Sequence, residues 1–306
     1  MLMPILKLIL KPIRQRGFSL VELLVAMTLG TALVLLSSTL YFSSKASFRL
    51  NDEKLRLQQD GSHAMGVMAK NLRQAGFGKL ASAGSLAVTD FIETDGQPAQ
   101  GLRGCAYGFA RPLGPGKDFS CSNAAGMAAF EVAYRTDDYA DPASGAGVDC
   151  NGSKVQPIAV PVDHPAYRLG PQVSIAKNLF FVARRAGSTA SALYCQGNGN
   201  NNSAQPLLNN VEQFQLAYDV ADASPRRWLD ASQVSALSDD QLANWKRVTS
   251  VRLCLQIRGD QMVSAEVQHY VDCDGAARVA EDRSLHQVFT STVTLRNQAA
   301  AIQVPP

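Results

Sequence analysis

Near its N-terminus the chain reads Arg14-Gln-Arg-Gly-Phe-Ser-Leu-Val-Glu22, and this stretch predicts more about the fold than any other. It joins a basic segment to an apolar one. Residues 18–42 are long and apolar enough to cross a bilayer as a helix, which takes about 20 residues. Glu22 is the only charged residue between Gly17 and Ser44. Because a charged side chain near a helix end in lipid costs roughly 1–3 kcal/mol, Glu22 needs a functional explanation.

An ordinary secretory signal and a plain membrane anchor are the two simplest explanations of a basic segment followed by an apolar one. The first would be cut after the apolar run, where Leu36-Ser-Ser-Thr39 is a poor cleavage site, and neither explains Glu22. The stretch resembles the class III signal of type IV prepilins. In that family a dedicated peptidase cuts after the glycine and methylates the new N-terminal residue. The resemblance implies a leader over residues 1–17, cleavage between Gly17 and Phe18, an N-methylated Phe18, and an assembly role for Glu22.

Charge and composition limit what the rest of the chain can do. The 306 residues are 46% apolar and 18% charged, enough for one large domain or two small ones. The formal charge of +3 comes from the four basic residues before Gly17, and without them the chain carries one net negative charge. A general nucleic-acid surface is therefore not expected. The basic leader should stay in the cytoplasm and the chain beyond about residue 42 outside, which is the periplasm in a bacterium with two membranes.

The cysteines all follow the apolar segment: Cys105, Cys121, Cys150, Cys195, Cys254 and Cys273. They include no Cys-x-x-Cys pair, so zinc spacing is absent and no metal is predicted. An even number of cysteines outside the membrane favours disulfides. Six cysteines allow 15 connectivities, so the pairing cannot be deduced. Nearness in sequence and strand geometry favour Cys105–Cys121 and Cys254–Cys273, which leaves Cys150–Cys195.

The helix is predicted to continue past the apolar run to about Ala75. Its apolar residues recur at helical spacing and form one stripe, made of Leu50, Leu57, Ala64, Met68, Leu72 and Ala75. This stripe should contact a globular domain. Gly76 and Gly78 should end the helix, as glycines commonly do.

Beyond Gly78 the pattern changes to short β-type runs, at 129–134, 179–183, 214–220, 248–257, 262–271 and 288–295. Residues 258–261 are predicted to form a hairpin turn, and residues 233–244 a short helix. The expected fold is α+β, with a long N-terminal helix packed by its second half on an antiparallel β-rich head. The expected division is 18–42 for the membrane-spanning half of the helix, 43–78 for its amphipathic half, and 79–306 for the head.

No sequence motif indicates catalysis, so neither an enzyme nor a cofactor is predicted. Gly116-Lys117 lacks the first glycine and the Ser/Thr of a phosphate-binding loop. An acidic segment could offer oxygen ligands to calcium, but its spacing matches no calcium loop. It consists of Asp137, Asp138, Asp141 and Asp149.

Three further stretches resemble the PilW family of type IV pilus minor pilins. They are Arg56-Leu-Gln-Gln-Asp-Gly61 with Ala69-Lys-Asn-Leu-Arg-Gln-Ala-Gly-Phe77; Tyr194-Cys-Gln-Gly197 with Val211-Glu-Gln-Phe-Gln-Leu-Ala-Tyr218, Trp245 and Val251-Arg-Leu-Cys-Leu255; and Val288-Phe-Thr-Ser-Thr-Val-Thr-Leu-Arg-Asn297. The family is similar in fold to the J pseudopilin of type II secretion, which is the alternative reading. A membrane-tethered periplasmic enzyme is a second alternative.

The PilW resemblance implies a non-catalytic protein that primes pilus assembly with other minor pilins and then sits at the fibre tip. There it could support adhesion and twitching motility. Its implied partners are other minor pilins, the major pilin, the prepilin peptidase, the inner-membrane assembly platform, membrane lipid and a tip adhesin. The implied location is the inner membrane, with the head in the periplasm, and later the extracellular pilus tip.

Overall fold

The computed structural model describes residues 17–78, 91–92, 98–113, 119–136, 147–163, 167, 171–200, 203–221, 227–263 and 266–297. The chain divides into two compact units, Met1–Asn51 and Asp52–Pro306. The expected leader therefore lies outside the described residues, apart from Gly17.

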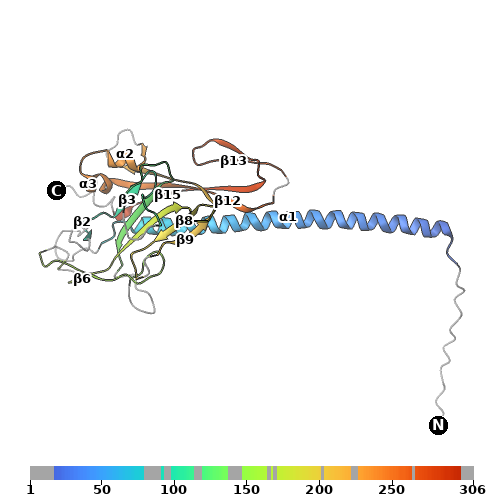
Figure 1. The fold of residues 1–306 in the computed structure, drawn as a ribbon, viewed down its shortest axis with the longest axis horizontal. Coiled ribbons are helices and arrows are strands. Elements are labelled where there is room, and N and C mark those ends of the chain that lie inside the picture. Colours follow the sequence, from blue (N-terminus) through green and yellow to red (C-terminus); the bar gives the residue numbers. More distant parts are fainter. Residues whose placement is uncertain are drawn as a thin grey trace, which may run out of the picture. The chain divides into compact units, whose positions relative to one another are not determined.

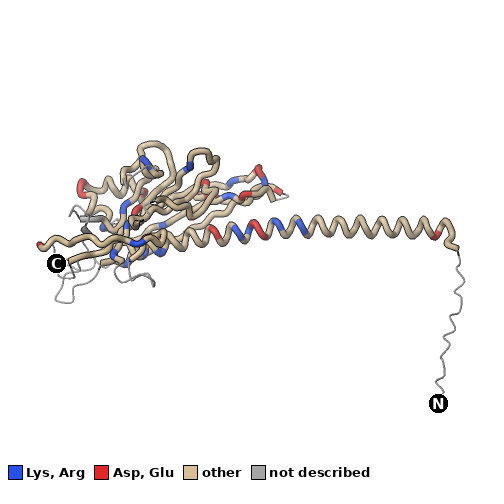
Figure 2. Tube along the Cα trace, turned by 60° about the horizontal axis from the view of Figure 1, so that its bottom comes forward, with Lys and Arg blue, Asp and Glu red and all other residues tan. Residues whose placement is uncertain are grey.

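One helix, α1 (Leu20–Gln74), begins in the first unit and ends in the second (Figure 1). Residues 20–42 of the helix are mostly apolar and nearly all exposed, with Glu22 as their single charged residue, and Figure 2 shows a long stretch of the helix without charge. The helix ends where it was predicted to end. Ala75 N–H still donates to the carbonyl of Leu72 (3.1 Å), and Gly76 then adopts a φ of 72°, the left-handed conformation that commonly follows a helix.

A five-stranded antiparallel sheet has the order β3-β4-β7-β8-β9. Its strands are β3 (Leu102–Cys105), β4 (Ala129–Arg135), β7 (Ile175–Ala183), β8 (Ala192–Gln196) and β9 (Gln205–Asn209). Both faces are largely buried in β3, β4, β7 and β8, whereas β9 is mostly exposed. Phe130 and Phe180 stack in the main core, with ring centroids 4.9 Å apart, whereas Phe181 and Tyr194 belong to a second apolar cluster on the other face.

A four-stranded antiparallel sheet has the order β11-β10-β12-β15. Its strands are β11 (Trp228–Leu229), β10 (Val211–Val220), β12 (Val248–Met262) and β15 (Ser284–Thr294). The hairpin turn predicted at 258–261 is wrong, because β12 continues through it to Met262, which pairs with Ser284. A register shift after Arg258 absorbs the turn-like residues Gly259 and Asp260 as an irregularity within the strand.

The remaining elements are short. Three two-stranded pairs are β1 (Phe91–Ile92) with β2 (Pro98–Ala99), β5 (Ile158–Ala159) with β6 (Gln172–Val173), and β13 (Gln268–Val271) with β14 (Ala277–Ala280). The strand predicted at 262–271 is thus β13 at its end only. The single helix predicted at 233–244 is two, α2 (Ala231–Ser235) and α3 (Gln241–Lys246). Each has its own aspartate N-cap, Asp230 and Asp240, which explains the break.

The second half of α1 is part of the main core, together with residues of both large sheets. Leu57, Ala64, Met68 and Leu72 of the predicted stripe are buried there. Gly61 leaves room for the ring of Phe289, since a side chain on Gly61 would overlap that ring. The predicted fold class is confirmed: a long, apolar N-terminal helix and an antiparallel β-rich head.

Candidate assembly site

The predicted cleavage site lies just before α1. Gly17 and Phe18 are exposed, Phe18 to 84% of its surface, and neither belongs to the helix. Ser19 and Glu22 form a reciprocal cap. Ser19 N–H donates to Glu22 Oε2 (3.3 Å), and Glu22 N–H donates to Ser19 Oγ (3.2 Å). The Ser-x-x-Glu spacing is the sequence signature of such a capping box, which our sequence interpretation did not use.

The capping box gives Glu22 a local role that does not depend on charge. A capping box fixes where a helix starts, so it keeps Gly17 and Phe18 outside the helix. A neutral glutamine could accept the same bond from Ser19. The charge of Glu22 is therefore available for the assembly role that the prepilin resemblance implies, and this role stays a prediction.

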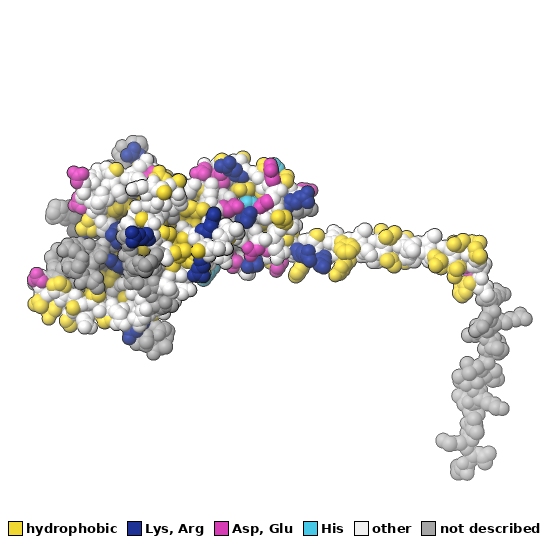
Figure 3. All heavy atoms as spheres, viewed as in Figure 1, with side chains coloured by type: hydrophobic (Ala, Val, Ile, Leu, Met, Phe, Trp, Pro, Cys, Tyr) yellow, Lys and Arg dark blue, Asp and Glu magenta, His cyan; other side chains and the backbone are white. Residues whose placement is uncertain are grey.

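The apolar half of α1 has no covering partner among the described residues. Residues 18–37 and 39–49 are all exposed, and Figure 3 shows hydrophobic side chains along this part of the helix. By length and composition α1 can cross a membrane, and none of its most apolar window is buried within the structure. Such a surface requires lipid or neighbouring apolar helices around it.

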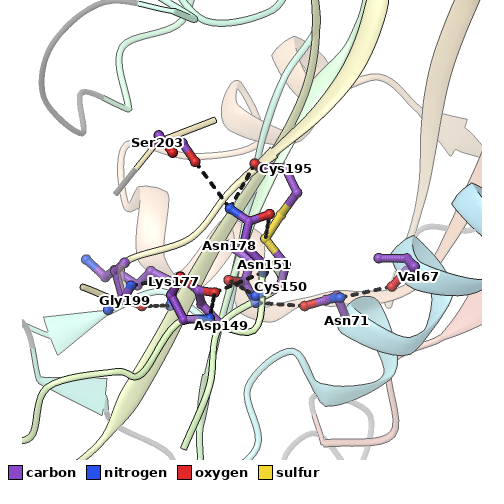
Figure 4. The surroundings of a disulfide bond; sticks show 12 residues. Val67, Asn71, Asp149, Cys150, Asn151, Lys177, Asn178, Cys195, Gly199 and Ser203 are labelled. Carbon is purple, nitrogen blue, oxygen red and sulfur yellow. Dashed lines mark hydrogen bonds between the residues drawn. A yellow bond between two sulfur atoms is a disulfide. The ribbon is translucent and has the colours of Figure 1, made fainter. Parts of the chain in front are cut away.

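A buried polar network joins the second half of α1 to the five-stranded sheet (Figure 4). Asn71 on α1 accepts hydrogen bonds at Oδ1 from the hydroxyl of Tyr134 on β4 (3.2 Å) and from Nδ2 of Asn178 on β7 (2.7 Å). Asn178 Nδ2 also donates to the Tyr134 hydroxyl (3.0 Å), and Asn178 Oδ1 accepts from Cys150 N–H (3.0 Å). Since each of these three side chains is at most 5% exposed, the network fixes the rotation of the helix on the sheet.

Asp149 organises the loop next to this network. Its carboxylate accepts backbone hydrogen bonds from Asn151 (2.9 Å), Ser153 (2.9 Å) and Gly199 (2.8 Å). Three backbone N–H donors satisfy the buried Asp149 carboxylate, so its burial does not require a bound cation. The other members of the acidic segment, Asp137, Asp138 and Asp141, lie outside the described residues.

A second contact seats α1 on the four-stranded sheet. Glu53 is 4% exposed, and its Oε1 accepts from Asp260 N–H (2.8 Å) in the irregular part of β12. Arg56 lies one turn further along and pairs with the Asp260 carboxylate (3.4 Å). Sequence reasoning overlooked Glu53. Its position, three residues after Leu50 and four before Leu57, places it on the apolar stripe, and that was the available signal.

The six cysteines form three disulfides, and no free cysteine occurs in the described chain. The pairs are those that the sequence favoured: Cys105–Cys121, Cys150–Cys195 and Cys254–Cys273, with Cα atoms 5.3, 6.5 and 5.7 Å apart. The third attaches the turn between β13 and β14 to strand β12.

A charged cluster lies where the β13–β14 hairpin meets the sheet. His286 Nδ1 lies 2.8 Å from Glu212 Oε2, its Nε2 lies 3.5 Å from Asp282, and the Tyr270 ring stacks on it at 4.8 Å. Burial lowers the pKa of His286, but the hydrogen bonds and charges of Glu212 and Asp282 outweigh burial and raise this pKa above its ordinary value. Burial likewise raises the pKa of Glu212, but its bonds to His286 and Gln256 bring this pKa below the ordinary value.

None of these groups forms a recognisable reaction centre. Among the described residues, no group of three or more His, Cys, Asp and Glu side chains could hold a metal ion. The cluster around His286 has no Ser, Cys or Thr hydrogen-bonded to the imidazole, so it lacks the nucleophile of a hydrolytic triad.

Comparisons with known proteins agree with the sequence-based interpretation. Residues 179–297 match the family model of PilW, the type IV pilus-assembly protein W, and residues 13–38 match the prokaryotic N-terminal methylation motif. No curated protein matches the chain. Among solved structures, the chain is similar to the type IV-like pilin TTHA1219 from Thermus thermophilus. The two share 10% identity over 79% of this chain and 98% of the other, with a TM-score of 0.36. The match to PilW thus includes β15, and the match to the methylation motif spans the predicted cleavage site and the start of α1, so the chain is similar to PilW in its C-terminal part and to prepilins at its N-terminus.

Proposed function

We propose that this chain is a minor pilin that primes assembly of a type IV pilus and remains at the tip of the fibre. One combination of observations carries the proposal. Residues 179–297 match PilW, and the N-terminal methylation motif leads into an apolar helix that the described residues leave uncovered. A helix of this kind has two suitable surroundings, lipid before assembly and the helices of other pilins afterwards. The protein then starts in the inner membrane with its head in the periplasm.

Processing and pairing at the N-terminus supply the chemistry of assembly. The prepilin peptidase cuts after Gly17 and methylates the new α-amino group of Phe18. Within an apolar bundle of helices the Glu22 carboxylate is costly unless a positive group lies next to it. The α-amino group of a neighbouring subunit, or that of the same chain before assembly, is the partner that the bundle offers.

The size of the head supports a position at the start of the fibre. Without residues 1–17 the mature chain has 289 residues, which is large for a subunit that repeats along a fibre. A head that occurs only once in a fibre does not have to pack against copies of itself, so its size is no obstacle at the tip. At the tip it is also in a position to hold an adhesin and to support adhesion and twitching motility. The role is structural, without catalysis.

Deleting the gene and counting surface pili tests the proposal. We expect the number of pili to fall sharply while the pool of major pilin in the membrane is unchanged. In sheared fibres, quantitative mass spectrometry should find this chain far below the major pilin and in step with other minor pilins. Abundance equal to that of the major subunit contradicts a tip position, and normal pili with a loss of protein secretion favour the J-type pseudopilin alternative.

A further inference from the structure

Strand β15 is an edge strand. It pairs with β12 on one side, and no strand of the described residues pairs with it on the other. The edge is 11 residues long and contains no proline and no lysine. Natural proteins normally protect long edges with such residues, with bulges or with a covering segment, because exposed backbone groups pair with any suitable strand.

The register shows which backbone groups point outward. Leu295 N–H donates to the carbonyl of Thr249 on β12 (2.8 Å), so residue 295 bonds inward. Because inward and outward bonding alternate along an antiparallel strand and the register is unbroken from Thr294 to His286, the even-numbered residues bond outward. The N–H and C=O groups of Val288, Thr290, Thr292 and Thr294 therefore face the open edge.

The other end of the strand confirms this phase and shows how an edge is closed. His286 N–H donates to Gln268 Oε1 (2.7 Å), and Gln268 Nε2 donates to the His286 carbonyl (2.8 Å). The amide of Gln268 thus replaces a neighbouring strand at this one position. Beyond it, Thr290, Thr292 and Thr294 are exposed, and no strand in the described parts of the chain pairs with this edge.

The helix α1 runs beside this strand. Gln58 contacts Gln287, Gly61 contacts Phe289, and Asn297 Nδ2 donates to the carbonyl of Ala75 (3.2 Å). A neighbouring chain whose helix packs along α1 in this region therefore brings its head close to β15. Threonine side chains suit this contact, because they favour strands and carry no charge that would repel a partner.

We propose that the 288–294 edge of β15 receives an extended strand from the head of another minor pilin and so enlarges the four-stranded sheet. The inference rests on the proposed function, since it names the contact by which this head joins its neighbour. Affinity comes from backbone hydrogen bonds at four outward positions, the usual basis of strand addition.

Hydrogen exchange resolved to single amides tests the contact in full-length chains. The mature protein is purified in detergent alone and after co-expression with each other protein of the same bacterium that carries the N-terminal methylation motif. In the complex, the amides of Thr290, Thr292 and Thr294 should exchange at least about tenfold more slowly. The amides of Ser291 and Val293 already bond to β12 and should change much less. The inference is overturned if both sets of amides are protected to the same extent, or if neither set is protected.

A matched pair of variants gives a second test. Thr292→Pro removes one outward N–H and leaves the ladder with β12 intact, a change that edge strands tolerate. Thr292→Ala keeps the backbone and removes only the side chain. We expect Thr292→Pro, but not Thr292→Ala, to weaken association by about tenfold or more. Equal effects of the two, or protection of the edge in a complex between copies of this chain alone, overturn the inference. A wild-type chain that binds none of the co-expressed proteins contradicts the proposed function as well.

Discussion

Tyr134→Phe tests whether the buried network fixes α1 on the head. The hydroxyl of Tyr134 donates to Asn71 and accepts from Asn178, and the substitution removes both bonds without changing the ring. Asn178 Nδ2 keeps its 2.7 Å bond to Asn71, so neither asparagine is left without a partner. At a net 0.5–1.5 kcal/mol for each bond, and with this partial compensation, the free energy of unfolding should fall by about 1–2 kcal/mol.

The expected shift in melting temperature follows from chain size. A loss of 1 kcal/mol lowers Tm by roughly 2–4 °C in proteins of 150–250 residues, so Tyr134→Phe should melt about 2–8 °C below the wild type. The assay is thermal unfolding of the mature chain in detergent, followed by near-ultraviolet circular dichroism, which reports packing of the head rather than helix content. Asn178→Ala should lose more, about 2–4 kcal/mol, because it also leaves Cys150 N–H without its acceptor.

Tyr107→Phe is the control for this experiment. Tyr107 is 52% exposed, and its hydroxyl makes no hydrogen bond with the described residues. The same chemical change there should leave the Tm within about 1 °C of the wild type, as expected for surface substitutions. The role given to the network is refuted if Tyr134→Phe has the Tm of the wild type, or if Tyr107→Phe lowers the Tm as much as Tyr134→Phe does.

Four further predictions concern processing, assembly, covalent stabilisation and pH. Gly17→Val should block removal of the leader, and a mature N-terminus found by mass spectrometry at the wild-type position would contradict the cleavage site. Glu22→Val and Glu22→Gln should both be cleaved yet reduce surface pili, as counted by electron microscopy; normal pili with Glu22→Gln would show that capping, not charge, matters. Cys254→Ser should destabilise the head by roughly 2–5 kcal/mol and lower its abundance on immunoblots; unchanged abundance and Tm would contradict a structural disulfide. Because the folded chain raises the pKa of His286, this residue adds stability that is complete below its ordinary pKa of about 6.5 and lost as pH rises through the higher folded pKa. The unfolding midpoint of the wild type should therefore fall as pH rises above about 6.5 and stay flatter in His286→Gln, with exposed His269→Gln as the control.

The sequence predicted the elements whose residues have a regular period. The stripe from Leu57 to Ala75 and the glycines after it fixed the end of α1, because helical spacing and a left-handed glycine are local signals. Alternation likewise located β15 and most of β10. Strand β8 and β9 were missed, since β8 is buried on both faces and shows no alternation, and β9 is mostly exposed.

The wrong hairpin turn has a different physical cause, which is that tertiary contacts overruled the local turn chemistry. Arg258-Gly-Asp-Gln261 has the composition of a hairpin turn, yet β12 passes through it. The buried Glu53 accepts a bond from Asp260 N–H, and only a glycine at 259 lets that carboxylate approach so closely, because a side chain there would come within 2.6 Å of Glu53 Oε1. The glycine that indicated a turn in fact allows the helix to sit on the strand.

The same reasoning separates what could and could not be predicted about the candidate site. Gly17, Phe18 and Glu22 are adjacent in sequence, so their pattern was readable, and the capping box of Ser19 with Glu22 could have been read with them. The contacts that hold the head on α1 join residues far apart in the chain, as in the pairing of Asn71 with Asn178. No periodic pattern along a single sequence indicates which distant residues will pair. The open edge of β15 belongs to this second class, because its phase follows from the register with β12, and only a structure provides that register.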